Sequence, residues 1–356
     1  MKKNKFFLIT FVAFIIGMGF LFLKPSKISE KNIIRNIIEK KEIGKQEQLS
    51  DIFKKDKVWG TLVYQSGHLK GPKSISAGYA NYTKREKNSA TTDYMLASLQ
   101  KGYTATLIQM LIDEKKISMT TKLSQFYPEI KYSTKITIRE LLDHTSGIQM
   151  GETAPKVMLT SDASAVEWTI HHLKSTGKMY WNYSNANYTL LAGIITKVTG
   201  KSYAEILNEN IIAPLKLKKT SELDNSIINN AAKTYNYGSN GVLHAMSYEL
   251  VSSELGCGNL YTTPIEYFKF VSALQNNRLL SSAALNQLTR NRLEAYSGGY
   301  YYSPTGQRAD GVDNGYFDFY YADNVKHNSM ILMLNKGISD AQGRSMIQQI
   351  ENILTA

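Results

Sequence analysis

The sequence predicts an α+β fold in which an antiparallel β-sheet is flanked by helices and lies beside a mainly helical lobe, preceded by one N-terminal transmembrane helix. Three observations support this prediction. Segments rich in Tyr, Phe, Ile and Val gather near both ends of the chain, whereas helical periodicity dominates its middle. An uncharged run follows three N-terminal lysines. The length of 356 residues is sufficient to bury a large core, although a single cysteine excludes an intramolecular disulfide.

The uncharged run extends from Phe6 to Leu23 and is 18 residues long. As a helix it would measure about 27 Å, which nearly crosses the hydrocarbon core of a bilayer. Lys2, Lys3 and Lys5 favour a cytoplasmic N-terminus. Because the run is longer than a usual signal-peptide core and no A-x-A site follows it, we expect an uncleaved signal anchor in residues 1–24, with a cleaved signal peptide as the alternative. The rest of the chain would lie outside the cell, at the cell membrane.

Residues 25–57 have the composition of a charged stalk. Residues 1–57 contain 13 Lys and Arg against 6 Asp and Glu, a net charge of +7 within a chain total of +12. Such a segment could lie against anionic lipid head groups or polyphosphate chains, although a solvated linker has the same composition. Isoleucines at 33, 34, 37 and 38 predict a short amphipathic helix within the stalk. One domain, residues 58–356, would follow.

The elements of this domain can be assigned in order along the chain. Early strands are expected at 58–64 and 73–79, and late strands at 294–302, 315–322 and 329–335. Helices are expected between them at 98–116, 137–143, 163–174, 187–199, 203–211, 264–276 and 281–290. A last helix, 339–354, closes the chain. Strands at both ends around a helical middle favour an α+β fold, with an antiparallel sheet covered by helices on both faces and a mainly helical lobe beside it.

The most informative motif is S-x-x-K at Ser98–Lys101, where an extended segment gives way to a helix. Residues three apart on a helix share one face, so the Lys101 amine can reach the Ser98 hydroxyl. A serine hydroxyl becomes a good nucleophile only when a neighbouring base takes its proton, and a helix N-terminus favours a developing oxyanion. The alternative is a serine N-cap followed by a solvated lysine. A second copy, Ser175–Lys178, lies in a polar stretch and is expected to be a loop.

A second motif, Tyr183–Asn185, lies within Trp181–Asn185, just before another apolar run. A tyrosine and an asparagine two apart can point the same way from an extended turn. The phenol can relay a proton between nucleophile and leaving group, and the amide can bind a substrate carbonyl and the lysine. The alternative interpretation is a structural Tyr-Asn turn.

Several other classes of chemistry find no support in the sequence. There is no H-E-x-x-H motif, one cysteine, and the neighbouring His171 and His172 point to different sides of a predicted helix, so no metal or other cofactor is expected. No nucleic-acid motif is present, so nucleic acid is not an expected partner. A G-x-S-x-G elbow is also absent. Cys257 is expected to be a small buried residue near the pocket.

With both motifs in view, the chain resembles the serine hydrolases of the β-lactamase and penicillin-binding-protein superfamily, in the class C-like branch that includes D-alanyl-teichoic-acid esterases. The resemblance covers about residues 58–337. Further segments that carry it are Leu141–Ile148, similar to the branch's "LLxHTSG", Leu190–Tyr203, similar to its helix after Y-x-N, Ile212–Leu215, similar to its "I-x-P-L", and Glu254–Tyr261, similar to its "xxGGLxST".

The resemblance implies roles for individual residues. Ser98 would be the acylated nucleophile, and its backbone N–H would supply half of the oxyanion hole. Lys101 would be the general base, or would hold Tyr183 as a phenolate that acts as the base. Asn185 would orient the substrate and the lysine. The site would lie where the Ser98 helix, the Tyr183 loop and the Gly311 strand meet.

The superfamily's third motif, K-T-G or H-x-G on a late strand, aligns with Arg308–Tyr316 but departs from the pattern. Gly311 matches the motif's glycine, the position of the cation falls on Ala309, and the middle residue is Asp310. A shift of the alignment by one residue would bring Arg308 near the site. As aligned, the cation that helps bind a substrate carboxylate is missing and an acid is present.

This departure favours a substrate without a free carboxylate. Penicillins and stem peptides ending in D-Ala-D-Ala carry one, whereas a D-alanyl ester on a polyol phosphate presents an ammonium instead. Asp310 or Asp313 could pair with that ammonium, so Asp310, Gly311 and Asp313 are expected to bind substrate. The alternative is that Asp310 is a solvated turn residue.

The expected partner is therefore D-alanylated teichoic or lipoteichoic acid, and the expected activity a D-alanyl esterase. Two alternatives stay open: a penicillin-binding protein with D,D-carboxypeptidase activity on peptidoglycan stem peptides, and a non-catalytic wall-binding or immunity protein. The presence of all four residues Ser98, Lys101, Tyr183 and Asn185 argues against the second of these. The low Pro count and the richness in Lys, Asn, Ile and Tyr suggest a Gram-positive source.

Overall fold

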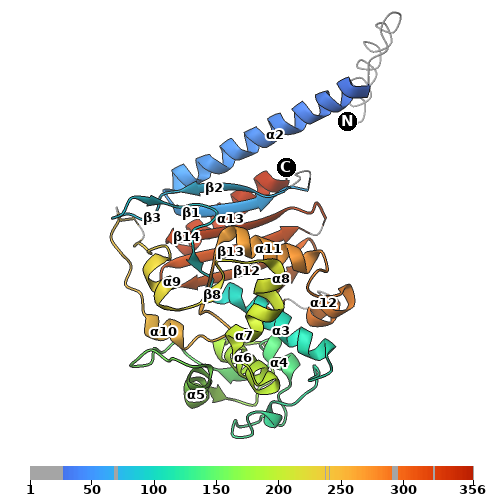
Figure 1. The fold of residues 1–356 in the computed structure, drawn as a ribbon, viewed down its shortest axis with the longest axis vertical. Coiled ribbons are helices and arrows are strands. Elements are labelled where there is room, and N and C mark those ends of the chain that lie inside the picture. The colour runs from blue at the N-terminus through green and yellow to red at the C-terminus, as the bar shows by residue number, and fades with distance from the viewer. Residues whose placement is uncertain are drawn as a thin grey trace, which may run out of the picture. The chain divides into compact units, whose positions relative to one another are not determined.

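The structure is a computed structural model that describes residues 27–67, 71–236, 238–239, 241–290, 296–323 and 325–355 (Figure 1). The predicted transmembrane run, Phe6–Leu23, lies outside the described residues. Within them, no helix combines the length and the apolar character needed to cross a bilayer. The chain forms two compact units, one that ends at Gln48 and one that begins at Leu49.

A single helix, α2 (Lys27–Asp56), replaces the short amphipathic helix predicted for the stalk. Its exposed surface carries ion pairs at helical spacing, such as Arg35 with Glu39, and each such pair adds a few tenths of a kcal/mol at most. Ile33 and Ile43 are exposed. The last turns of α2, from Leu49 onward, belong to the second unit, so its core begins before the predicted boundary at residue 58.

The centre of the second unit is a seven-stranded antiparallel sheet of order β10-β11-β12-β13-β14-β1-β2. Its strands are β10 (Tyr296–Ser297), β11 (Tyr300–Ser303), β12 (Gly306–Asp313), β13 (Tyr316–Asp323), β14 (Ser329–Lys336), β1 (Trp59–Gln65) and β2 (Lys73–Ala77). The pairing of β1 with β14 joins the two ends of the domain, with Leu62 opposite Leu332. The predicted antiparallel sheet is therefore confirmed, and the structure adds that strands from both ends of the domain pair within it.

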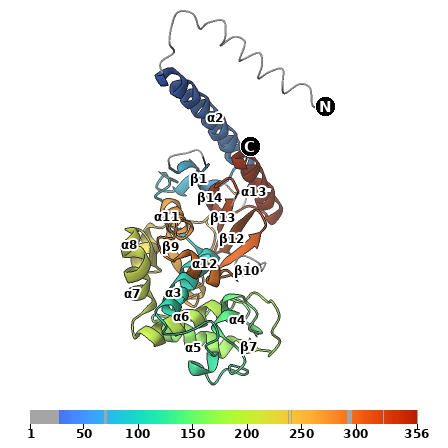
Figure 2. The ribbon, with the colours of Figure 1, turned by 90° about the vertical axis from the view of Figure 1, so that its right-hand side faces the viewer.

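The two faces of the sheet bury different side chains because neighbouring strand residues point to opposite sides. Leu332 and Leu334 of β14 pack with the C-terminal helix α13 (Asp340–Thr355) and the end of α2, whereas Ile331 and Met333 face the main core. Figure 2 shows α13 on one side of the strands and α11 (Pro264–Gln275) on the other. Burying each such side chain contributes about 1.5–3 kcal/mol.

Helices cover the main-core face and form the lobe beside it (Figure 1). They are α3 (Lys101–Asp113), α4 (Ile138–Leu142), α5 (Asp162–His172), α6 (Asn185–Thr199), α7 (Tyr203–Leu207), α8 (Ala213–Leu215), α9 (Asn225–Asn230), α10 (Tyr248–Ser252) and α12 (Ser282–Leu288), with 3-10 turns η1 (Ala97–Gln100) and η2 (Leu123–Gln125) and a π turn η3 (Asn208–Ile212). Short strands are β3 (Tyr79–Asn81), β4 (Glu86–Lys87), β5 (Tyr94–Met95), β6 (Ile148–Gln149), β7 (Lys174–Ser175), β8 (Ser221–Glu222) and β9 (Leu260–Thr262). The predicted helical lobe is present.

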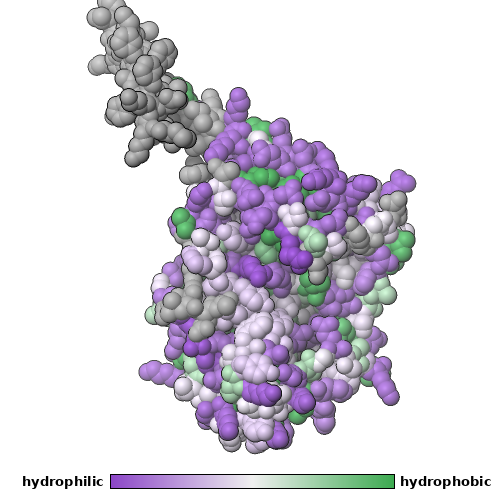
Figure 3. All heavy atoms as spheres, turned by 180° about the vertical axis from the view of Figure 1, so that it is seen from behind, coloured by the Kyte–Doolittle hydropathy of each residue, from purple (hydrophilic) through white to green (hydrophobic). Residues whose placement is uncertain are grey.

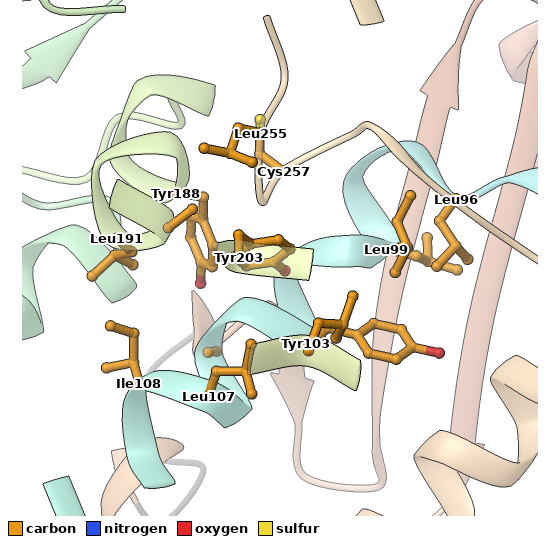
Figure 4. Packing of buried hydrophobic residues seen from close by; sticks show 14 of the residues in the cluster. Leu96, Leu99, Tyr103, Leu107, Ile108, Tyr188, Leu191, Tyr203, Leu255 and Cys257 are labelled. Atoms are coloured by element: carbon orange, nitrogen blue, oxygen red, sulfur yellow. The ribbon is translucent and has the colours of Figure 1, made fainter. Parts of the chain in front are cut away.

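The core between α3 and α6 positions the first two motifs against each other. Figure 4 shows Leu107 and Ile108 of α3 beside Tyr188 and Leu191 of α6. All four are at most 1% exposed. Hydrophilic residues spread over the outer face in Figure 3, with hydrophobic ones in scattered places. The contacts that fix α3 against α6 are therefore made by buried hydrophobic side chains.

Two predicted boundaries differ from the observed ones near the site. The helix expected at 98–116 is a 3-10 turn, η1, followed by α3, and it ends at Asp113 because Lys115 has a left-handed φ of +60°. The strand expected at 294–302 is split into β10 and β11 by Gly298 and Gly299, both of which have positive φ. Gly299 lies so close to α3 that a Cβ would be 2.7 Å from the Gly102 nitrogen.

Candidate active site

Ser98 lies in the tight turn η1, one turn before α3 begins at Lys101. The preceding Ala97 has a φ of +43°, a left-handed conformation that residues with a Cβ rarely adopt. The turn leaves Ser98 partly exposed on a cavity while Leu99 and Lys101 are buried. The Ser98 hydroxyl therefore faces the cavity, whereas the neighbouring side chains of the turn are packed in the interior.

The Lys101 ammonium is 1% exposed and contacts three acceptors. Nζ lies 2.9 Å from Ser98 Oγ, 2.9 Å from Asn185 Oδ1 and 3.1 Å from the Cys257 carbonyl oxygen. Three acceptors match the three N–H donors of an ammonium. The spacing predicted from S-x-x-K is therefore realised as a direct contact.

Tyr183 and Asn185 reach the same point from the start of α6. The Tyr183 hydroxyl donates to Ser98 Oγ at 2.8 Å, and the Lys101 Nζ lies 4.9 Å from the centre of the Tyr183 ring. Asn185 Nδ2 donates to Glu254 Oε1 at 3.2 Å while its Oδ1 accepts from Lys101. The structure thus brings together all four residues predicted to be catalytic.

The segment Leu141–Ile148 holds the Tyr183 loop in place. The His144 carbonyl accepts from the Asn182 N–H at 2.8 Å, and His144 Nδ1 accepts from the Ser184 N–H and from Asn187 Nδ2. Its Nε2 therefore carries the proton and faces Tyr296 Oη at 3.3 Å. Burial and the nearby Lys101 charge hold the His144 pKa well below its ordinary value, so the ring stays neutral. His144 positions the loop, a role that the motif alone did not reveal.

The charge state of Lys101 follows from its surroundings. Burial alone lowers the lysine pKa, but Tyr183, Cys257 and Glu254 raise it, and the balance lies above the ordinary value. Lys101 is therefore an ammonium at neutral pH. This state suits the second of the two predicted roles, in which Lys101 supports Tyr183 as the group that moves the Ser98 proton.

The backbone of β12 passes directly beside the Ser98 turn at Gly311. A Cβ at this position would lie 2.6 Å from the Leu96 carbonyl oxygen and 3.3 Å from the Ser98 nitrogen. Only glycine permits this approach. The Ser98 N–H and the β12 backbone therefore border the position where an ester oxygen would become an oxyanion.

Gly311→Ala is expected to lower kcat/KM by about 100-fold, the usual cost of disturbing one oxyanion donor. The added methyl group must push β12 away from η1. Steady-state hydrolysis of an activated ester measures the effect, and Gly337→Ala is the control because nothing lies within 4 Å of that position. Unchanged activity in a folded Gly311→Ala variant would contradict the role of this approach.

Ser98 opens into a cavity of about 260 Å³ whose charged lining is entirely acidic. The acids are Glu152, Glu254, Asp310 and Asp313, and no Lys or Arg is among the lining residues of this cavity. A smaller cavity of about 110 Å³ adjoins it and shares Tyr183, Asn185, Glu152, Glu254 and Cys257. A substrate carboxylate would meet repulsion here, whereas a cation would be attracted.

Glu254 is the most buried of these acids, with 7% of its surface exposed. Its Oε1 accepts from Asn185, and its Oε2 has no hydrogen-bond partner among the described residues; the same holds for Asp313 Oδ2. Burial first, and then the neighbouring Asp313, raise the Glu254 pKa well above its ordinary value. Gly258 leaves room for this carboxylate, since a Cβ there would lie 2.2 Å from Glu254 Oε2.

Asp310 lines the same cavity but has a partner. Arg308 Nη1 donates to Asp310 Oδ2 at 2.6 Å, and the Arg308 guanidinium lies 4.7 Å from the centre of the Tyr301 ring. Arg308 and Asp310 are two apart on β12 and so share one face. The predicted substrate-binding residues Asp310, Gly311 and Asp313 thus all border the site, but Asp310 is already neutralised.

Cys257 is buried beside the pocket, as predicted. Burial, together with Glu254, raises the pKa of its thiol to about 12, so it is not a thiolate nucleophile at neutral pH. Within the residues that the structure describes, no group of three or more His, Cys, Asp or Glu side chains is arranged to hold a metal ion. Neither Glu152 nor Glu254 was identified from the sequence as a residue of the site, although Glu254 begins the segment Glu254–Tyr261 that carries the family resemblance.

Comparison with known proteins gives consistent results. The family described as beta-lactamase matches residues 52–354. Teichoic acid D-alanine hydrolase from Staphylococcus aureus is 32% identical over 289 residues, which cover 76% of this chain and 70% of that protein. The crystal structure of FmtA from Staphylococcus aureus has a TM-score of 0.76 and 27% identity, and the match covers 87% of each chain.

A more distant structure agrees in fold. D-amino acid amidase from Ochrobactrum anthropi SV3 has a TM-score of 0.78 at 20% identity, covering 89% of this chain and 99% of the amidase. At this identity the likeness concerns the fold alone.

Proposed function

The chain belongs to the beta-lactamase family of serine hydrolases, and we propose that it is an esterase that removes D-alanine from teichoic or lipoteichoic acid through a Ser98 acyl-enzyme. The observation that carries this proposal is a nucleophile that opens into a cavity lined by four acids and by no lysine or arginine. The similarity to a teichoic acid D-alanine hydrolase supports the same substrate.

The geometry supports the following acylation step. Tyr183, in the phenolate form that the Lys101 ammonium supports, receives the Ser98 proton at Oη, which lies 2.8 Å from Ser98 Oγ, while Lys101 Nζ, 2.9 Å from the same oxygen, stabilises the negative charge that develops. Oγ attacks the ester carbonyl, the carbonyl oxygen takes the charge beside the Ser98 N–H, and Tyr183 returns a proton to the departing polyol oxygen. Water then attacks the acyl-enzyme by the reverse use of the same groups and releases D-alanine and free Ser98.

The acids of the cavity explain why an aminoacyl ester is preferred to a β-lactam or a stem peptide. The ammonium of a D-alanyl ester can pair with Glu254 and Asp313, each of which has an oxygen without a hydrogen-bond partner among the described residues. Its positive charge would favour release of the proton that burial and Asp313 otherwise hold on Glu254. A substrate carboxylate would be placed beside the same oxygens without a compensating cation. Desolvated like charges are costly, so D,D-carboxypeptidase activity and penicillin binding are disfavoured.

We also propose that Phe6–Leu23 anchors the chain in the cell membrane with residues 58–356 outside the cell. The support is the uncharged run itself and the lysines before it. This arrangement would bring the site to a polymer of the cell envelope. Protease treatment of intact cells tests it: digestion of the domain with retention of a membrane-bound N-terminal fragment is expected, and full protection would contradict it.

D-alanine release from D-alanylated lipoteichoic acid by the full chain tests the proposed activity, with Ser98→Ala alongside. Release that requires Ser98 is expected, and labelling by a fluorescent penicillin should be slow or absent. Absence of release together with rapid penicillin labelling would overturn the esterase assignment in favour of a penicillin-binding protein.

A further inference from the structure

Two lysines lie near the ring of one tyrosine, Tyr132, on the helical lobe outside the active site, and two more, Lys122 and Lys178, belong to backbone segments that meet there. Lys131 Nζ lies 4.9 Å and Lys135 Nζ 5.8 Å from the centre of the Tyr132 ring. Lys122 Nζ donates to the Lys135 carbonyl oxygen at 3.4 Å. Lys178 follows Gly177, whose position is so close to the ring that a Cβ would lie 2.8 Å from it. We call Lys122, Lys131, Lys135 and Lys178 the Tyr132 lysine cluster.

The cluster is held by a defined backbone rather than by loose side chains. Tyr132 has a φ of +65° and Gly177 a φ of +71°, so both turns adopt left-handed conformations. Thr176 donates to the Gly147 carbonyl oxygen through both its N–H and its Oγ1, which ties the Lys178 loop to the segment that carries His144. The lysines thus extend from a surface whose position relative to the site is set by hydrogen bonds.

The charge of the cluster is not neutralised by neighbouring acids. No salt bridge joins any of its four lysines to an acid among the described residues, although Lys116 and Lys201 elsewhere on the surface are paired in this way. Lys131, Lys135 and Lys178 are exposed. Like charges held together without partners raise the local positive potential and attract anions.

An exposed strip of side chains joins the cluster to the active site. Met179, Tyr180 and Trp181 follow Lys178, and Tyr183 comes after the half-buried Asn182; these four side chains are between 36% and 51% exposed. Five residues span at most about 18 Å, so the cluster begins within that distance of Tyr183, which contacts Ser98. Several exposed large hydrophobic side chains within five residues are typical of an interaction surface.

We propose that the Tyr132 lysine cluster and this strip form a binding track for a polyanionic polyol phosphate, with phosphates on the lysines and the carbon chain against the exposed strip. The inference rests on the proposed function for the identity of the polymer. In this arrangement the two parts of the binding surface have opposite charge. The lysines bind the phosphates of the polymer, and the acids of the cavity bind the ammonium of the ester. A polymer would therefore be bound in one orientation, with its D-alanyl group at Ser98.

The test compares a triple variant, Lys131→Gln, Lys135→Gln and Lys178→Gln, with a control triple that removes the same charge elsewhere. The control is Lys216→Gln, Lys218→Gln and Lys269→Gln, three exposed lysines that line neither cavity. In the full chain the cluster variant should hydrolyse D-alanylated lipoteichoic acid with a kcat/KM lowered by tenfold or more, mainly through KM. Its kcat/KM on D-alanine methyl ester should stay within about twofold, and its dependence on salt should weaken.

Binding separates this inference from the proposed function. Full chains that carry Ser98→Ala, with and without the cluster triple, are titrated with lipoteichoic acid stripped of D-alanine and with vesicles of anionic phospholipid. Loss of polymer binding only in the cluster triple supports the track even if no D-alanine is released by the wild type. Equal loss in the control triple, or loss of vesicle binding with polymer binding intact, would overturn it, the latter in favour of a membrane-facing surface.

Discussion

Ser98→Ala and Lys101→Ala are each expected to lower kcat/KM by about 10⁴-fold or more, and the double variant should be no worse than Ser98→Ala alone. When two residues assist the same chemical step, removing either one already abolishes that step, so the losses of transition-state stabilisation from the two substitutions do not add. Lys101 Nζ has Ser98 Oγ as a direct contact and stabilises charge only when that oxygen is the nucleophile. Once Ser98 is absent, the lysine has no reaction to assist.

Loss of Lys101 also removes the donor for two buried acceptors, Asn185 Oδ1 and the Cys257 carbonyl oxygen. Each unpartnered buried group costs about 1–3 kcal/mol, so Lys101→Ala should also lower the melting temperature. Activity must therefore be measured well below the unfolding transition, with the fold checked by circular dichroism.

Tyr183→Phe avoids this complication, because it keeps the Lys101 contacts and removes only the hydroxyl. Its kcat/KM should fall nearly as much as that of Lys101→Ala.

The measurement is steady-state hydrolysis of a small D-alanyl ester, combined with intact mass after reaction with a fluorophosphonate. Wild type and the control Lys178→Ala, from the second S-x-x-K copy, should be labelled once and retain activity on the small ester. Ser98→Ala should be neither labelled nor active. Substantial turnover by folded Lys101→Ala would remove this lysine from the proton relay.

The four candidate catalytic residues could be selected from the sequence because each of the two motifs is local. Ser98 and Lys101 share one helical face by spacing alone, and Tyr183 and Asn185 belong to one short turn before α6. An antiparallel sheet followed from strand-like segments at both ends of the chain, although the pairing of β1 with β14 was not predicted. The meeting of the two motifs is not local, since Ser98 and Tyr183 are 85 residues apart, and it was expected only from the family resemblance.

The acids of the cavity could not be predicted in the same way. Glu152 and Glu254 come from loops that meet only after α5, α6 and the sheet have packed, and nothing in their own segments marks a charged site. The pairing of Arg308 with Asp310 was accessible in principle, because residues two apart on a strand share a face. It required recognising β12 as a full strand rather than a turn rich in Gly, Asn and Asp.

Glu254→Gln is expected to raise KM for a D-alanyl ester by about 10- to 100-fold while leaving a matched acetyl ester nearly unchanged. A hydrogen bond from a charged group is worth about 1.5–3 kcal/mol, which corresponds to this range. Only the aminoacyl ester carries the ammonium that can use the free Glu254 Oε2. Asp313→Asn should act in the same direction. Asp310→Asn is the matched control and should change KM less, because Arg308 already pairs with that carboxylate.

The same variant makes a prediction about stability with a defined sign. The Glu254 pKa is raised by burial and by Asp313, so the folded protein holds a proton that the unfolded chain releases above about pH 4.5. The free energy of unfolding therefore falls as pH rises above that value. Glutamine does not titrate, so the Glu254→Gln variant should not show this fall. The melting temperature of Glu254→Gln relative to wild type should become more favourable from pH 5 to pH 8. Equal KM changes for aminoacyl and acetyl esters would refute ammonium recognition and leave Glu254 with only its contact to Asn185.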